Sequence, residues 1–309
     1  IHLPQEIHEI KKARQKLIYE ELFVFMFKIQ YLKLLKEKEV GMEKAIDDSL
    51  IWNFVKKLPF SLTEDQEKAI RDGLHDLQSM KRMNRLLLGD VGSGKTIVAT
   101  VLMYANYLAG YQSAFMAPTE ILALQHYHSI REVLQDYPLH IEYLIGSMSK
   151  KEKSKIAEKL QKGEVDILIG THAILNEKLF FKNLGFIVTD EQHRFGVNQR
   201  DLLTQKGTLP DMLFMSATPI PRTYALTIYG DMDTSLIKQK PQGRREIITK
   251  VVKEKDLKEV LFKVLEVIKK GEQVYVVAPM ILEQEESDLK DVYLLKEKFD
   301  LAFHGKVPM

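Results

Sequence analysis

RLLLGDVGSGKT, at residues 85–96, joins a short apolar run to a glycine-rich turn that ends in a lysine and a threonine. It matches G-x-x-x-x-G-K-[ST] at every defined position, and a predicted strand before it and helix after it are the flanks that a phosphate-binding loop requires. Average residue usage makes chance agreement in a chain of about 300 residues a roughly 1% event. The stretch therefore predicts a P-loop α/β fold that binds a nucleotide.

The chemistry of this loop assigns a role to each of its residues. Its backbone N–H groups curl around a phosphate chain at a helix N-terminus, the lysine reaches the terminal phosphates, and the threonine hydroxyl is a ligand for Mg²⁺. The residues predicted to bind ATP and Mg²⁺ are Gly89, Gly92, Ser93, Gly94, Lys95 and Thr96.

Short apolar runs alternate with amphipathic stretches of helical length on both sides of this loop. This alternation is typical of a parallel sheet with helices on both faces. The predicted strands are Arg85–Leu88, Ser113–Ala117, Ile141–Ile145, Val165–Ile169, Phe186–Thr189 and Met212–Met215.

The flanking segments have other patterns. A helical period without Gly or Pro predicts a long helix over Gln5–Glu39, and its apolar stretch Phe23–Phe27 predicts packing against the body of the protein rather than a nucleic-acid stacking platform. A shorter helix is expected around Lys44–Lys56, and the polar stretch Asp231–Gln242 indicates a linker. The alternation then restarts, with strands expected at 247–252, 274–278 and 301–303 and helices at 256–270 and 285–299.

Two carboxylates, Asp190 and Glu191, follow the apolar run Phe186–Thr189. Ligands of open α/β sheets bind outside the carboxyl ends of the strands, so the pair is expected beside the nucleotide. One carboxylate can hold Mg²⁺ while its neighbour orients the attacking water. We therefore predict Asp190 and Glu191, with Lys95, as catalytic residues, and Asp190 with Thr96 as the metal ligands.

Composition limits the class of protein. Lys plus Arg number 45 against 43 Asp plus Glu, so the net charge of +2 gives no strong basic field, and any nucleic-acid function must come from motifs. The absence of cysteine excludes disulfides, thiolate zinc sites and cysteine nucleophiles, and indicates a reducing compartment.

The longest apolar run, Leu22–Phe27, is far shorter than the roughly 18–20 residues that span a bilayer. We expect a cytosolic protein without a membrane partner, and a fragment of a longer chain, because the sequence begins at Ile1 and stops without a closing element after Phe303.

Five motifs occur in the order found in superfamily 2 helicases. They are the P-loop, Ala117–Glu120, Gly170–His172, the DEAH-like box Asp190–His193, and Ser216–Pro219. DEQHRFGVNQR at 190–200, SATPIPRT at 216–223 and GDMDTSLI at 230–237 further resemble the RecG family of bacterial branched-DNA translocases. The resemblance covers essentially the whole chain. It implies a helical connector at 1–57, a first RecA-like lobe at 58–230, a linker at 231–246 and a partial second RecA-like lobe at 247–309.

The resemblance also implies roles for single residues. Gln66 is similar to the adenine-reading glutamine of the family, and Phe60 to an aromatic residue that lies against the base. Thr119, Thr171 and Arg222 stand where related proteins touch the DNA backbone, although a capping threonine or a surface arginine is the plain alternative for each. Gln192, His193, Ser216 and Thr218 are expected to couple the nucleotide state to lobe movement, and the tetrapeptide Ser216–Pro219 is equally an ordinary helix start.

The function that the resemblance implies is ATP-driven translocation on double-stranded DNA that remodels stalled forks and Holliday junctions. The parent is expected to be a monomeric bacterial protein of the cytoplasm and nucleoid. The family's wedge domain and the later half of its second lobe, which carries arginine fingers, are not in this chain, so we expect nucleotide binding with weak or no turnover. Two alternatives stay open: a transcription-repair coupling translocase of the Mfd type, and a nucleotide-binding module without turnover.

Overall fold

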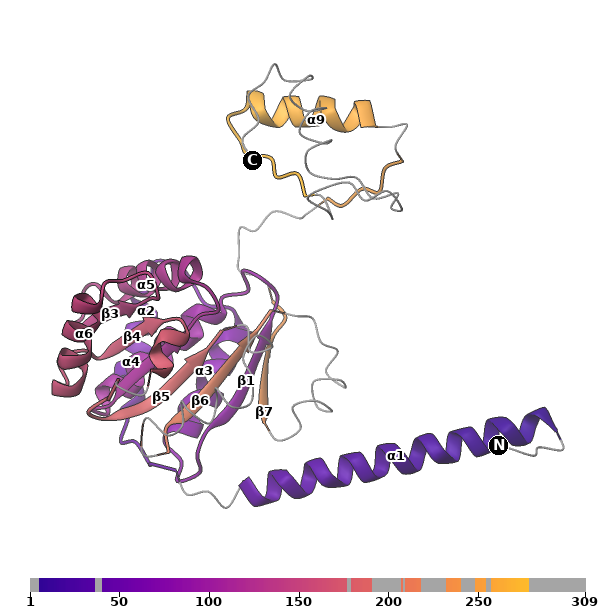
Figure 1. Cartoon of the computed structure of the whole chain (residues 1–309), viewed down its shortest axis with the longest axis horizontal. Coiled ribbons are helices and arrows are strands. Elements are labelled where there is room, and N and C mark those ends of the chain that lie inside the picture. Colours follow the sequence, from indigo (N-terminus) through magenta and orange to yellow (C-terminus); the bar gives the residue numbers. More distant parts are fainter. Residues whose placement is uncertain are drawn as a thin grey trace. The chain divides into compact units, whose positions relative to one another are not determined.

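Seven strands form one parallel sheet within the part of the chain that the structure describes (Figure 1). Their order across the sheet is β3-β4-β2-β5-β6-β1-β7. Their bounds are β1 Asn84–Gly89, β2 Gln112–Met116, β3 Ile141–Leu144, β4 Ile167–Gly170, β5 Leu184–Thr189, β6 Asp211–Ser216 and β7 Asp233–Ile237. The first six correspond to the six predicted strands. The Ile-, Leu- and Val-rich sequences of β4 and β5 suit inner strands that are buried on both faces of a parallel sheet.

The structure is a computed structural model, and it describes residues 6–36, 41–176, 179–190, 207, 209–217, 232–239, 248–253 and 257–277. It divides into two units, Ile1–Arg244 and Arg245–Met309, which are described separately below. Among the described residues, no helix is both long enough and apolar enough to cross a membrane.

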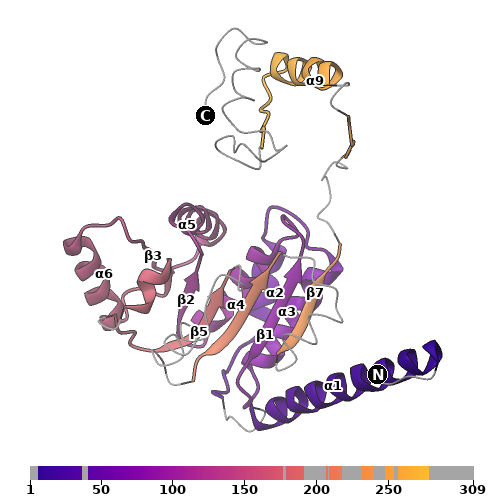
Figure 2. The same ribbon diagram turned by 45° about the vertical axis from the view of Figure 1, so that its right-hand side comes forward.

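Helices cover both faces of the sheet, as predicted (Figure 2). Alternate residues of each strand enter two separate cores, so that Leu87 belongs to one core and its neighbours Leu86 and Leu88 belong to the other. One face packs against α2 Asp48–Lys56, α3 Glu64–Leu77, α4 Lys95–Leu108 and α5 Glu120–Leu134. The other packs against α6 Lys150–Lys162 and the short 3₁₀ helix η1 His172–Leu175.

β7 was not predicted. Its residues fall in the expected linker 231–246, yet they pair in parallel with β1 from Arg85↔Asp233 to Gly89↔Ile237. The linker assignment is therefore wrong at 233–237, and the first lobe's sheet extends beyond the expected boundary at residue 230. The strand lies at the edge of the sheet, where only Ser235 and Ile237 are buried, so its sequence lacks the apolar run of a central strand.

α2 was assigned to the connector at 1–57, but it belongs to the core of the lobe. Ile51 and Phe54 are 0% and 2% exposed within the first core cluster, and the Phe54 ring lies 4.7 Å from that of Tyr104. The amphipathic pattern predicted the helix but gave no information on its packing partner.

Lys44 joins the segment before α2 to the amino-terminal edge of the sheet. Its Nζ donates to Gly185 O at 2.8 Å and forms an ion pair with Asp211, the first residue of β6. Asp211 Oδ1 also accepts a hydrogen bond from Met83 N at 2.7 Å. Burial lowers the pKa of Lys44 and raises that of Asp211, and the attraction between the two charges acts against both shifts. The pair was not predicted from the sequence, because its members are 167 positions apart.

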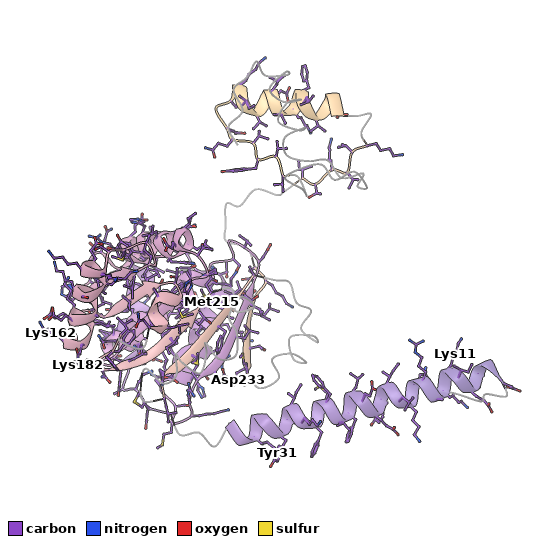
Figure 3. The ribbon with its side chains drawn as sticks, in the orientation of Figure 1. Lys11, Tyr31, Lys162, Lys182, Met215 and Asp233 are labelled. Carbon is purple, nitrogen blue, oxygen red and sulfur yellow. The ribbon has the colours of Figure 1, made fainter. Side chains whose placement is uncertain are left out.

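α1 Ile7–Lys36 confirms the predicted long helix, but its expected packing is not observed. Phe23, Phe25 and Phe27 are 58%, 43% and 63% exposed, and the side chains extend from the helix in several directions, as the labelled Lys11 and Tyr31 illustrate (Figure 3). The Phe23 ring is stacked between those of Tyr19 and Phe27, with ring centroids 6.2 and 6.5 Å away.

The second unit contains α9 Leu257–Lys269, which confirms the helix predicted at 256–270. The strands expected at 247–252 and 274–278 are not found in the described residues 248–253 and 271–277, which have no regular secondary structure. Parallel strands require hydrogen-bonded neighbours, and two short segments do not supply a stable sheet. The elements expected at 285–299 and 301–303 lie outside the described residues.

Candidate nucleotide site and sheet edge

The P-loop connects the carboxyl end of β1 to the first turn of α4. Gly92 and Gly94 have φ values of 73° and 87°, in the left-handed region that favours glycine. Gly94 is the N-cap of α4 and gives the helix no side-chain cap. The first N–H groups of α4 therefore keep the partial positive charge that binds anions.

Lys95 is folded back over its own loop. Its Nζ donates to Gly89 O at 2.8 Å and to Asp90 O at 3.0 Å, and the residue is only 9% exposed. Ser93 is 1% exposed, and its Oγ has no hydrogen-bond partner among the described residues. The side chain of Thr96, one position further, is partly exposed. The loop thus holds a buried cation beside a buried hydroxyl that lacks a partner.

Gln66 contacts the loop from α3. Its Nε2 donates to Ser93 O at 2.7 Å, and its Oε1 accepts from Thr63 N at 2.8 Å within a capping box. A Cβ added at Gly94 would lie 2.2 Å from Gln66 Nε2 and would displace the Gln66 amide, and the φ of 87° at Gly94 already favours glycine. Phe60, the other residue expected near the base, is 49% exposed.

Asp190 follows β5 and lies, like the P-loop, at the carboxyl ends of the strands. The register pairs Met116 with Thr189 and Leu88 with Ser216, so β5, β6 and β1 end close together and present Asp190, Ser216 and the P-loop on one side of the sheet. Asp190 N donates to Met116 O at 2.8 Å, and the residue is 9% exposed. Ser216 is 3% exposed.

His126 contacts Asp190 and was not identified from the sequence. Its Nε2 lies 2.9 Å from Asp190 Oδ2, and each side chain is 13% exposed. The two residues are 64 positions apart, and a histidine within a polar helical stretch has no motif to single it out.

The two described threonines that were expected to contact DNA are both helix caps. Thr119 Oγ1 accepts from Leu122 N at 3.3 Å at the start of α5 and remains exposed. Thr171 Oγ1 accepts from Ala173 N at the start of η1 and is 2% exposed. Of these two side chains, only that of Thr119 is open to solvent.

Glu120 fixes the loop after β3 beside Thr119. Its carboxylate accepts from Ser147 N at 2.9 Å and from Ser147 Oγ at 2.7 Å. The hydrogen bonds from Ser147 lower the pKa of Glu120. The remaining predicted site residues, Glu191, Gln192, His193, Thr218 and Arg222, lie outside the described residues.

Comparison with known proteins adds independent information. A family profile described as DEAD/DEAH box helicase matches residues 63–227. The chain is 45% identical over 304 residues to "ATP-dependent DNA helicase RecG" of Thermotoga maritima, covering 97% of this chain and 39% of that protein. It is 47% identical over 308 residues to the protein of the same name from Aquifex aeolicus, covering 95% and 38%.

A solved structure described as RecG bound to a three-way DNA junction superposes with a TM-score of 0.82 at 40% identity, covering 97% of this chain and 39% of that one. The MrfA helicase, at 20% identity and a TM-score of 0.55, shares the fold. The chain spans about two fifths of the length of the RecG relatives.

Proposed function

Because the chain belongs to the DEAD/DEAH box helicase family, we propose that it forms the nucleotide-binding part of an ATP-dependent motor that moves on branched double-stranded DNA. One observation carries this proposal: the P-loop with Lys95 and the carboxylate of Asp190 both lie at the carboxyl ends of strands in a single parallel sheet. The similarity to RecG proteins along 97% of the chain supports DNA as the polymer.

The residues present fit ATP and Mg²⁺. The uncapped start of α4, two glycines with positive φ and the buried hydroxyl of Ser93 form a cradle for phosphate oxygens. Mg²⁺ keeps several waters and combines one or two protein oxygens with substrate phosphates, so the oxygens of Thr96 and Asp190 would suffice as its protein ligands.

Each residue then has a defined task. With ATP bound, Lys95 would exchange its bonds to Gly89 O and Asp90 O for bonds to the terminal phosphates, and Thr96 and Asp190 would hold the metal. Bound Mg²⁺ supplies charge neutralisation for the transferring phosphoryl group. Glu191 would orient the attacking water, Phe60 would lie against the base, and Gln66, which donates to Ser93 O, would link base recognition to the P-loop.

We further propose that DNA is held by its backbone at the sheet edge, by the exposed Thr119 and by Arg222. Such contacts position a duplex without reading its sequence. The burial of Thr171 weighs against a direct contact from its side chain. The RecG relative whose structure is known is bound to a three-way junction, and we assign stalled forks and Holliday junctions to the same class of substrate.

Coupling between the nucleotide and the DNA is assigned to Gln192, His193, Ser216 and Thr218. Ser216 ends β6 between Asp190 and the P-loop, a position from which it can respond to both. The relatives from Thermotoga maritima and Aquifex aeolicus, at 45% and 47% identity, are RecG proteins. This favours a motor of the RecG type over a motor of the Mfd type.

Steady-state ATP hydrolysis with and without forked DNA tests the proposal. We expect fork-stimulated turnover in a protein of the full length of the RecG relatives, loss of that turnover on Lys95→Ala, and weak turnover by the 309-residue chain. Nucleotide binding without turnover in the full-length protein would instead indicate a binding module. Equal turnover by both lengths would show that the additional residues are dispensable for hydrolysis.

A further inference from the structure

The carboxylate of Asp190 is held by a residue that the motifs do not include. His126 Nε2 lies 2.9 Å from Asp190 Oδ2, and the backbone N–H of Asp190 donates to Met116 O at 2.8 Å. The imidazole is itself fixed, because its ring lies 4.6 Å from that of Phe115, which is 0% exposed on β2. Both the main chain and the side chain of Asp190 are therefore restrained.

The chemistry of the contact defines its direction. A carboxylate offers only acceptors, so the hydrogen is on Nε2 and His126 is the donor. With each side chain 13% exposed, water competes weakly for this bond. A carboxylate that binds a metal is commonly oriented by a hydrogen-bond donor of this kind, and loss of such a donor lowers metal affinity or activity about 10- to 100-fold.

The helix that carries His126 also carries the exposed Thr119 at its N-cap. The two residues are seven positions apart, about two turns along one face of an α-helix. Between and beyond them, Ala123 and Ile130 are 0% exposed in the core, so α5 packs against the core along its length as one continuous helix.

We propose that His126 is a positioning residue that holds the Asp190 carboxylate for Mg²⁺ and links it, through α5, to the DNA contact at Thr119. This inference rests on the proposed function. A displacement of α5 on DNA binding would change the His126–Asp190 distance directly, because the two side chains are in contact. The coupling is reciprocal, so Mg²⁺ and nucleotide must alter the affinity for DNA by the same factor by which DNA alters theirs.

The experiment measures ADP affinity of the 309-residue chain by calorimetry, in Mg²⁺ and in excess EDTA. His126→Leu should weaken binding of ADP with Mg²⁺ about 10- to 100-fold and leave binding in EDTA unchanged. His126→Gln places an amide donor near the position of Nε2 and should restore binding with Mg²⁺. His128→Leu is the matched control, because His128 is exposed on the same helix beside Tyr127.

A second pair of variants protects the test against misfolding. His126→Asn and His126→Gln carry the same amide, but the asparagine is one methylene shorter and does not reach Asp190 Oδ2. We expect the Mg²⁺-dependent loss in the asparagine variant alone. Forked DNA should change the affinity of the wild-type chain and of His128→Leu for ADP with Mg²⁺, and this change should disappear in His126→Leu.

Three results would overturn the inference: wild-type affinity in His126→Leu, an equal loss with and without Mg²⁺, or equal behaviour of the asparagine and glutamine variants. The second of these would show that His126 only packs against Phe115. Failure of the wild-type chain to bind ADP with Mg²⁺ at all would refute the proposed nucleotide site itself, which distinguishes the two failures.

Discussion

Replacing Lys44 with methionine removes the cation of a buried ion pair and leaves the carboxylate of Asp211 in the interior. The Lys44 and Asp211 side chains are 0% and 3% exposed, so water cannot replace the lost partner. Breaking a buried pair in this way costs about 3–5 kcal/mol of the free energy of unfolding. Asp211 keeps the hydrogen bond from Met83 N at 2.7 Å, and we therefore expect a loss near the lower limit, about 3 kcal/mol.

A second substitution tests the cause of this loss. In the Lys44→Met background, Asp211→Asn removes the buried charge and keeps an acceptor for Met83 N, so it should recover most of the stability. In the wild-type background the same change places an amide beside the Lys44 ammonium and should destabilise the lobe. This reversal of sign is the signature of a direct interaction in a double-mutant cycle.

Urea unfolding followed by tryptophan fluorescence provides the assay, because the chain has a single tryptophan, Trp52, in α2 of the first unit. Lys81→Met is the matched control. Lys81 Nζ lies 4.0 Å from Asp233 Oδ2 and the Lys81 side chain is 45% exposed. Such surface pairs contribute about 0–1 kcal/mol to the free energy of unfolding. A loss for Lys44→Met no larger than that for Lys81→Met would refute the assignment of Lys44 and Asp211 as a stabilising buried pair.

Three further outcomes follow from the structure. Ser147→Ala should raise the pKa of Glu120 toward its ordinary value of 4.5, as measured by NMR titration. Because folding lowers this pKa, the stabilisation from Ser147 is present above the ordinary pKa and is lost as the pH falls through the lowered pKa. Thr119→Ala should cost about 0.5–2 kcal/mol of stability as a lost helix cap and should also weaken DNA binding, and an unchanged DNA affinity in that variant would remove Thr119 from the interface. DNA binding itself should be insensitive to base sequence and fall steeply with salt, since phosphate neutralisation supplies nearly all of it, and a strong preference for one duplex over a scrambled one of equal length would contradict this.

The sequence predicted six of the seven described strands, because each carries an apolar run, which in β5 is buried along its whole length. It predicted the P-loop and Asp190 because glycines and carboxylates at strand ends form recognisable local patterns. β7 was missed because it is a polar edge strand. Its Ser235 is held by Arg85 and Asp72 through side-chain hydrogen bonds of 2.9 and 2.7 Å, which no local pattern records.

The contacts that join distant segments could not be predicted in the same way. His126 and Asp190 meet only because His126 of α5 lies against Phe115 of β2, the neighbour of β5, and Lys44 meets Asp211 only because the chain before α2 returns to the start of β6. In both cases the residue types are ordinary for exposed helices and loops. These two pairs matter because their side chains are largely buried, which the sequence pattern does not show.

Calorimetric titration of ADP with Mg²⁺ into the wild-type chain and into Lys95→Ala tests the central claim most directly. The wild-type chain should bind, and the variant should lose binding or weaken by more than about 10-fold, because each hydrogen bond to a charged group contributes about 1.5–3 kcal/mol. Lys81→Ala, which changes an exposed lysine outside the loop, should bind as the wild type does. Equal affinity of the wild-type chain and Lys95→Ala would contradict the assignment of the P-loop as the nucleotide site.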